Sequence, residues 1–221
     1  MAGIKQFGIK ERAFGSTQDT WLNSLLEDYL RGTMKPPRSG VFHPSTLSNT
    51  CDKAVWLIYH GKMIETPLEA VVQRIFQNGD YLEKRVESWF SNIGILVARE
   101  FPVKMEKPPM SGRIDFLIRH EIYGILPVEL KSINTSAFGQ LSKPKKEHQI
   151  QLQIYLNIGN YPMGTVLYEN KNDQKIKSYL VERDEKQWSD ILDRCFNIQE
   201  MKEPPTKCTG ARWCNCKLVE L

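Results

Sequence analysis

The chain has 221 residues, 41% of them hydrophobic and 25% charged, with a formal net charge of +4. This length can bury a substantial core in one domain, and no apolar run approaches the length of a membrane span. Five cysteines, an odd number, and no signal peptide argue against a secreted disulfide framework, whereas the mildly basic charge permits nucleic-acid binding without indicating it.

The first half of the chain is predicted to be mostly helical. Residues 1–15, rich in Gly, Lys and Arg, are expected to form a flexible or DNA-contacting arm. Apolar spacing predicts a helix over 17–32, and the proline-bearing segment 34–40 then reads as a linker. Two more helices are predicted over 45–60 and 66–93.

The second half alternates strands and helices. Period-two patterning predicts strands, and helical spacing predicts helices near residues 150 and 190. The expected strands are 94–105, 113–119, 125–133, 163–170 and 175–182, and the expected helices are 147–159 and 185–201. An α/β fold follows, in which helices flank a central mixed sheet and the C-terminal cysteine tail folds back across the N-terminal helices.

We expect a single domain over 1–221. Its parts are the arm (1–15), a helical part (45–93), a catalytic sheet and helix (94–182), and a C-terminal helix with the cysteine tail (183–221).

Two acids and a lysine are the strongest chemical signal. Glu129 and Lys131 are two apart on a predicted strand, so they project from the same face. Asp115 lies on the preceding strand, and the short segment 120–124 favours an antiparallel hairpin between the two. Two carboxylates can hold Mg²⁺ or Mn²⁺, and a lysine can position or help deprotonate a water that attacks a phosphodiester. The alternative is a solvated strand face with a Glu/Lys pair.

Two further features favour the catalytic interpretation. Glu129 sits inside the near-continuous apolar run 125–130, where an unpartnered charge is costly to bury. Gln151 and Tyr155 then follow four residues apart on one face of a predicted helix.

The order G-R-I-D, V-E-L-K-S and Q-x-x-x-Y resembles the PD-(D/E)xK nuclease superfamily, in its RecB-like exonuclease branch. This resemblance implies a restriction-endonuclease-like core. It also implies that Asp115 and Glu129 bind the metal with the backbone carbonyl of Leu130, and that Lys131 orients the nucleophile. Gln151 would hold the lysine or a phosphate, and Tyr155 would steer the nucleic acid.

The RecB-like branch also has a metal-binding histidine on an upstream helix, in a G-x-x-x-H-x-x-x-E pattern. Glu83 takes the place of that histidine in the segment 79–87. A carboxylate in this place favours oxygen-preferring cations such as Mg²⁺ and Mn²⁺. An ordinary exposed helix position is the alternative for Glu83, and Glu87 is its nearest competitor.

Three of the five cysteines lie in the last fourteen residues, and a fourth, Cys51, lies far upstream. The segment around Cys51 resembles the one that opens RecB-like nucleases with an iron–sulfur cluster, such as the CRISPR-associated exonucleases and the AddB nuclease domain. That resemblance implies a [4Fe–4S] cluster held by Cys51, Cys208, Cys214 and Cys216, although the C-terminal spacing C-x5-C-x-C departs from the usual C-x2-C-x5-C.

Other interpretations of the cysteines remain open. Four thiolates also suit Zn²⁺, and free thiols on a tail are the third possibility. Cys195 differs from the other four, because helical spacing places it on an apolar face and predicts a core position.

The resulting prediction is a cytoplasmic, metal-dependent DNA nuclease from a prokaryotic or viral setting. It is expected to act as an exonuclease or end-processing enzyme on single strands or duplex ends, without membrane association. The sequence does not determine its oligomeric state. Lys131, Lys143, Lys145 and Lys146 are expected to border one cleft and pair with phosphates, with a solubilising loop as the alternative. The alternative functions are an inactive DNA-end-binding module and a nuclease of CRISPR adaptation or RNA processing.

Overall fold

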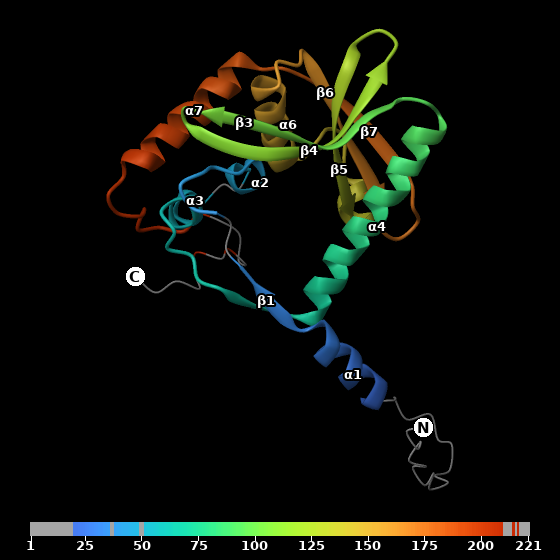
Figure 1. The fold of residues 1–221 in the computed structure, drawn as a ribbon, viewed down its shortest axis with the longest axis horizontal. Coiled ribbons are helices and arrows are strands. Elements are labelled where there is room, and N and C mark those ends of the chain that lie inside the picture. The colour runs from blue at the N-terminus through green and yellow to red at the C-terminus, as the bar shows by residue number, and fades with distance from the viewer. Residues whose placement is uncertain (1–19, 36–37, 49–50, 210–213, 215, 217–221) are drawn as a thin grey trace, which may run out of the picture.

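A five-stranded mixed sheet forms the centre of the protein in the computed structural model, which describes residues 20–35, 38–48, 51–209, 214 and 216. The strand order is β3-β4-β5-β6-β7, with β5 and β6 parallel and all other neighbours antiparallel (Figure 1). The strands are β3 (Leu96–Glu106), β4 (Pro109–His120), β5 (Gly124–Ile133), β6 (Met163–Asn170) and β7 (Ile176–Glu182). The predicted α/β fold with a mixed sheet is therefore confirmed.

Helices cover both faces of this sheet. The helices among the described residues are α1 (Thr20–Leu30), α2 (Pro44–Leu47), α3 (Asp52–Tyr59), α4 (Ala70–Asn92), α5 (Thr135–Gly139), α6 (Lys146–Ile158) and α7 (Glu185–Glu200). Leu82 and Val86 of α4 pack against Leu130 on one face, whereas Leu152 of α6 packs with Ile133 on the other. Because residues 130 and 133 differ in strand parity, α4 and α6 lie on opposite faces. No helix among the described residues is long and apolar enough to cross a membrane.

The N-terminal part departs from prediction in two places. The helix predicted over 45–60 is divided into α2 and α3, and the one predicted over 66–93 begins only at residue 70. Residues Thr66–Leu68 form strand β2, which pairs with β1 (Gly32–Met34). β1 lies at the junction of the predicted helix and linker, and only the tertiary fold brings it beside β2. The predicted arm over 1–15 lies outside the described residues.

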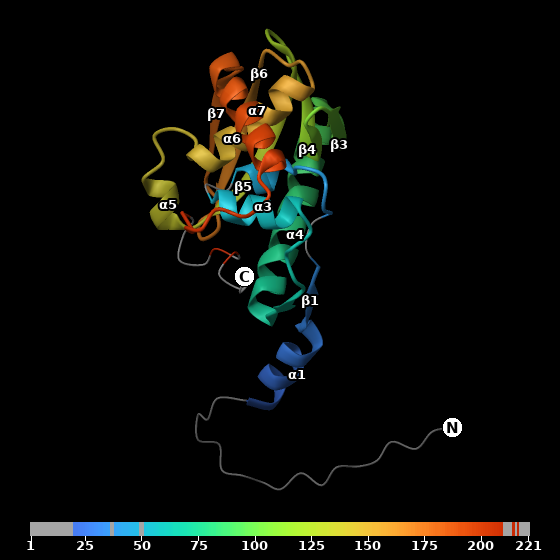
Figure 2. The ribbon, with the colours of Figure 1, turned by 90° about the vertical axis from the view of Figure 1, so that its left-hand side faces the viewer.

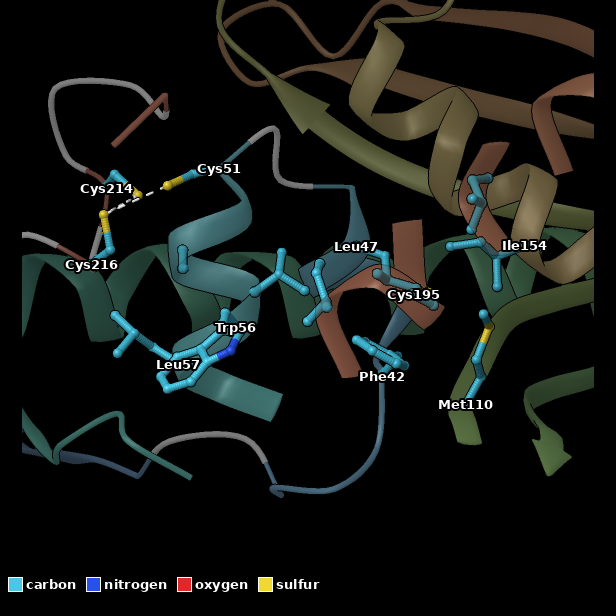
Figure 3. Close-up of a cluster of buried hydrophobic side chains, with 14 residues drawn as sticks. Phe42, Leu47, Cys51, Trp56, Leu57, Met110, Ile154, Cys195, Cys214 and Cys216 are labelled. Atoms are coloured by element: carbon cyan, nitrogen blue, oxygen red, sulfur yellow. Dashed lines mark hydrogen bonds between the residues drawn. The ribbon is translucent and has the colours of Figure 1, made fainter. Parts of the chain in front are cut away.

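A buried apolar cluster ties the N-terminal helices to the C-terminal segment (Figure 3). The Trp56 indole of α3 donates a hydrogen bond of 2.9 Å to the carbonyl of Met201, just after α7. Arg194 of α7 donates to Asp52 of α3 at 2.7 Å. Cys195 is fully buried in this cluster, so its predicted core position is confirmed.

One glycine allows three elements to meet. A Cβ at Gly112 of β4 would lie 2.8 Å from a ring carbon of Pro44 in α2 and 3.0 Å from a ring carbon of Tyr155 in α6. Both distances are shorter than ordinary carbon–carbon contacts. The absence of a side chain at position 112 thus lets α2 and α6 close around the middle of β4, where Asp115 follows.

Candidate active site and metal centre

The predicted β4–β5 hairpin is present, and its strands separate where the acids lie. The paired positions run from His120 and Gly124 to Phe116 and Val128. At the next step the backbone N–H of Leu130 donates to Asp115 Oδ2 at 2.7 Å. The side chain of Asp115 therefore takes the place of a main-chain acceptor, which fixes its carboxylate at the point of divergence.

Glu129 and Lys131 form a buried ion pair on one face of β5, as their spacing predicts. Lys131 Nζ lies 2.5 Å from Glu129 Oε1, and the glutamate side chain is completely inaccessible to solvent. Glu129 Oε2 accepts no hydrogen bond from the described residues. An unpartnered carboxylate oxygen at this depth is costly, and a bound cation would compensate it.

Burial shifts the proton affinities of these groups. It raises the pKa of Asp115 to about 6, against the opposing charge of Lys131. It raises the pKa of Glu129 to about 8, and the nearby charge of Asp115 adds to that shift. Burial alone would lower the pKa of Lys131, but the carboxylates of Glu129 and Asp115 outweigh it and raise that pKa. Lys131 therefore stays a cation, and the two acids repel each other unless a further positive charge joins them.

A cavity of 370 Å³ opens beside Asp115 and also receives Glu83 from α4. Arg99 lies 3.5 Å from Glu83 and 2.9 Å from Glu87, so it holds both carboxylates on one side of the helix. Glu83 lines the cavity and its charge contributes to the raised pKa of Asp115, whereas Glu87 does not line it. The structure therefore brings Glu83, the residue at the histidine position, to Asp115.

Gln151 and Tyr155 lie on one face of α6, directed toward the acids. Gln151 Nε2 donates to the Tyr155 hydroxyl at 3.4 Å, and both side chains are buried. Tyr155 lines the cavity, and burial together with the charge of Glu129 raises the pKa of its hydroxyl. That hydroxyl therefore remains a hydrogen-bond donor for a ligand in the cavity.

The carboxylates fit a hard divalent cation. Mg²⁺ binds through one or two protein carboxylates and completes its shell with water or substrate phosphate. Asp115 and Glu129 supply such oxygens, one of them without a partner, and Glu83 lies across the cavity. The Leu130 N–H is fixed by Asp115, and the role of the Leu130 carbonyl as a ligand stays a prediction.

Several residues of the cavity had no signal in the sequence. Glu100 and Arg113 form an ion pair of 3.1 Å at its edge. Glu100 has a φ of 46°, a backbone conformation that is rare and costly for a side chain of this kind. The remaining lining comes from His43, Pro44, Ser45, Thr46, Ser111 and Gly112. Their proximity depends on α2 packing over β4, which no local pattern reveals.

The predicted lysine cleft is not formed as one unit. Lys143 lines a groove beside Arg183, and Lys146 lines a separate pocket beside Asp190. Neither lines the cavity next to Asp115. Lys143 and Lys146 therefore border different pockets, so the expectation that all four lysines border one cleft is wrong.

His148, three residues before Gln151 on α6, is a neighbour that the sequence did not single out. Burial lowers the pKa of His148 to about 4, and the positive charges of Lys131 and Lys145 add to that shift. Its Nδ1 lies 2.8 Å from the hydroxyl of Tyr168. His148 is therefore neutral and sits close to Lys131 without competing for the carboxylates.

The four predicted cysteines meet at one point. The sulfur of Cys51 lies 3.8 Å from that of Cys208 and 3.6 Å from that of Cys216, and Cys214 lies 3.4 Å from Cys216. All four sulfur atoms lie within 4.8 Å of one another and none is in a disulfide. Among the described residues, no other group of three or more Cys, His, Asp or Glu side chains is gathered this closely.

This arrangement suits a metal bound by thiolates. Burial raises the pKa of Cys214 and of Cys216, so both thiols stay protonated until a cation offsets the charge. The sulfur separations match the edge of a tetrahedron around one ion, about 3.8 Å for Zn–S bonds of about 2.3 Å. A [4Fe–4S] cube places each thiolate on a different iron, so its binding requires the sulfurs to move apart.

The fold, but not the sequence, is similar to known proteins. No family model matches the chain, and no curated protein sequence is significantly similar to it. The crystal structure of SSO0001 superimposes with a TM-score of 0.56 at 18% identity, covering 90% of this chain and 92% of that one. The alkaline exonuclease LHK-Exo from Laribacter hongkongensis superimposes with a TM-score of 0.51 at 17% identity, covering 72% and 86%. Its complex with dAMP gives 0.51 at 16% identity with the same coverage. At these identities the shared property is the fold: the chain has the α/β architecture of an alkaline exonuclease.

Proposed function

We propose that the protein is a metal-dependent DNA nuclease of the PD-(D/E)xK type that removes nucleotides from single strands or duplex ends. The observation that carries this proposal is the buried Glu129–Lys131 pair next to Asp115, which itself lines a solvent-accessible cavity. Burying two acids next to each other destabilises a fold, so such an arrangement is expected where it serves chemistry. The fold shared with an alkaline exonuclease supports the same function.

The proposed reaction is hydrolysis of a phosphodiester. A water oxygen forms a bond to phosphorus and that water gives up a proton to the solvent, while the bond to the leaving oxygen breaks and the leaving oxygen takes up a proton from the solvent. A divalent cation held by Asp115, Glu129 and Glu83 would neutralise charge on the phosphate and make the water more acidic. The cationic Lys131 orients the water and stabilises negative charge in the transition state. With its raised pKa it does not act as the base.

Tyr155 and Gln151 have supporting roles in this proposal. Tyr155 lines the cavity, and its hydroxyl would donate a hydrogen bond to the nucleic acid, because its buried ring leaves no face on which a base could stack. Gln151 fixes that hydroxyl through its own hydrogen bond. Both residues thus position the substrate and do not transfer protons.

Incubation with end-labelled DNA tests the proposal. We expect single-stranded and duplex DNA to be shortened from an end with Mg²⁺ or Mn²⁺ and to remain intact with a chelator. RNA of the same sequence serves as the matched substrate that distinguishes an RNA-processing nuclease. A protein that binds DNA ends but cleaves nothing in either metal would instead be the inactive DNA-end-binding module.

Glu83 is expected to set the metal requirement of the reaction. Glu83→Ala removes a carboxylate from the cavity, so a higher Mg²⁺ or Mn²⁺ concentration should be needed for half-maximal cleavage, by about 10-fold or more. Glu83→His should recover part of the activity with Mn²⁺, because imidazole suits that metal better than Mg²⁺.

Glu87→Ala is the matched control, because Glu87 pairs with the same Arg99 but does not line the cavity. Its metal titration should resemble that of the unmodified protein. A shifted titration for Glu87→Ala with an unchanged one for Glu83→Ala would transfer the ligand role to Glu87.

We further propose that Cys51, Cys208, Cys214 and Cys216 bind a structural metal. The metal would tie the start of α3 to the C-terminal cysteines, so that the chain forms one domain. The family resemblance favours a [4Fe–4S] cluster, and the sulfur spacing also suits a single zinc ion. In either case the metal links α3 to the C-terminal segment, beside the packing of Trp56 on Met201.

A further inference from the structure

Helix α1 has an apolar face that no described part of the chain buries. Its large apolar side chains fall within an arc of about 140° on the helix circumference. Their exposed fractions are 70% for Trp21, 47% for Leu22, 50% for Leu25, 47% for Leu26 and 83% for Tyr29. An amphipathic helix normally directs such a face into a core, and none of the side chains of α1 is buried.

The helix also stands apart from the sheet. Figures 1 and 2 both show α1 projecting beyond the start of α4, away from the rest of the domain. Its link to α4 includes a polar contact, in which Arg74 donates to Glu27 at 2.9 Å. Glu27 lies outside the apolar arc, so this contact leaves Leu25, Leu26 and Tyr29 open to solvent.

Exposed apolar side chains also lie at the start of α4, the helix that contacts α1. Val71, Ile75 and Phe76 are exposed by 53%, 48% and 47%. At roughly 100 Å² for a half-exposed side chain of this size, the apolar side chains of α1 and the start of α4 expose on the order of 800 Å², which is what each partner buries in an interface of standard size. A surface of this extent is larger than single exposed apolar residues account for.

The chemistry of α1 selects the kind of partner. The helix contains no lysine or arginine, and the two arginines beside it, Arg31 and Arg74, are paired with Asp28 and Glu27, so little positive charge is left for the phosphates of a nucleic acid. An anionic membrane surface is equally disfavoured, because helices that bind it carry basic residues beside the apolar face. An uncharged apolar helix face can, however, pack against the same face of a second copy, which is what a two-fold symmetric interface requires.

We propose that α1 and the start of α4 form the dimer interface of this protein, with the apolar face of α1 buried against the same face of a second copy. An isolated helix of 11 residues is only marginally stable in water. Pairing two copies supplies the buried face that each α1 lacks. The proposal rests on the exposed surface alone and holds whether or not the protein cleaves DNA.

Sedimentation velocity tests the interface. The unmodified protein should sediment at twice its chain mass of 25.6 kDa at high micromolar concentration and shift toward the monomer on dilution. The double variant Leu26→Glu, Tyr29→Glu places like charges in the interface and should sediment as a monomer throughout. Its circular dichroism should keep the signal of the α/β domain, because neither side chain is buried.

Ile122→Glu is the matched control, since Ile122 is 79% exposed in the β4–β5 turn, away from α1. It should dimerise like the unmodified protein. The proposal is overturned if the unmodified protein is a monomer at every concentration. In that case either residues 1–19 or a different protein would be the partner of the face. A dimer that survives in the double variant overturns it as well.

Discussion

Lys131→Ala is expected to abolish DNA cleavage while leaving the fold and most DNA binding intact. Lys131 is the one cation in contact with Glu129 among the described residues, and the carboxylates of Glu129 and Asp115 keep it charged although it is buried. Loss of a positioned group that assists attack and stabilises charge typically lowers a rate by about 10²- to 10⁴-fold. The measurement is the initial rate of digestion of end-labelled DNA at saturating Mg²⁺.

Asp115→Asn and Glu129→Gln should lose cleavage to a similar extent, for a different reason. Each keeps the size of the side chain and removes the charge that attracts a cation. The amide oxygen of Asn at position 115 can still accept the Leu130 N–H, so the divergence of β4 and β5 should persist. Glu129→Gln removes like-charge repulsion with Asp115 and keeps an amide oxygen that can accept a hydrogen bond from Lys131, so the change in thermal stability should be small.

Lys143→Ala is the matched control for the lysine. It removes the same charge from a groove that is separate from the acid cavity. Its cleavage rate should match that of the unmodified protein. Digestion at the unmodified rate by Lys131→Ala would show that the assigned active site is wrong, as would equal losses in the two lysine variants.

Cys51→Ser is expected to release the bound metal and to cause the largest loss of stability among these variants. The four sulfur atoms lie within 4.8 Å although Cys51 is 157 residues away from Cys208. A metal that closes such a long loop contributes folding free energy, because the site exists only in the folded chain. Loss of one of four ligands should therefore lower the melting temperature and the metal content together.

The metal itself is identified in the same experiment. Protein purified without oxygen is expected to be brown, with iron and sulfide and broad absorption near about 400 nm, if the thiolates hold a [4Fe–4S] cluster. A colourless protein with one equivalent of zinc would keep the same ligands around a single ion. Metal-free protein with four titratable thiols at these positions would exclude the centre.

Cys195→Ser is the control that separates binding from packing. Cys195 is fully buried in an apolar cluster, and a hydroxyl there costs about 1–3 kcal/mol of stability. Its sulfur is not part of the four-cysteine group, so the metal should be retained in full. Bound metal per chain, and not the melting temperature alone, therefore decides which cysteines are ligands.

The sequence by itself determined the local geometry of this protein. The two-residue period of a strand put Glu129 and Lys131 on one face, and the structure pairs them at 2.5 Å. The helical period put Gln151 and Tyr155 together, and they form a hydrogen bond. The resemblance of the Cys51 segment to iron–sulfur nucleases likewise implied the four-cysteine group that the fold assembles. These features depend on short repeats or on a short motif, both of which are visible in the chain.

Only the tertiary structure decided which distant segments meet. The packing of α4 against the sheet places Glu83, and not Glu87, at the cavity beside Asp115. Glu100 also reaches the cavity, from a backbone conformation that is rare for its residue type. The tertiary structure also dispersed the lysines of the α6 turn and left the apolar face of α1 uncovered by the described residues. The physical reason is that packing between elements depends on the shapes of both surfaces and on long-range pairing such as β1 with β2, whereas periodicity reports one element at a time.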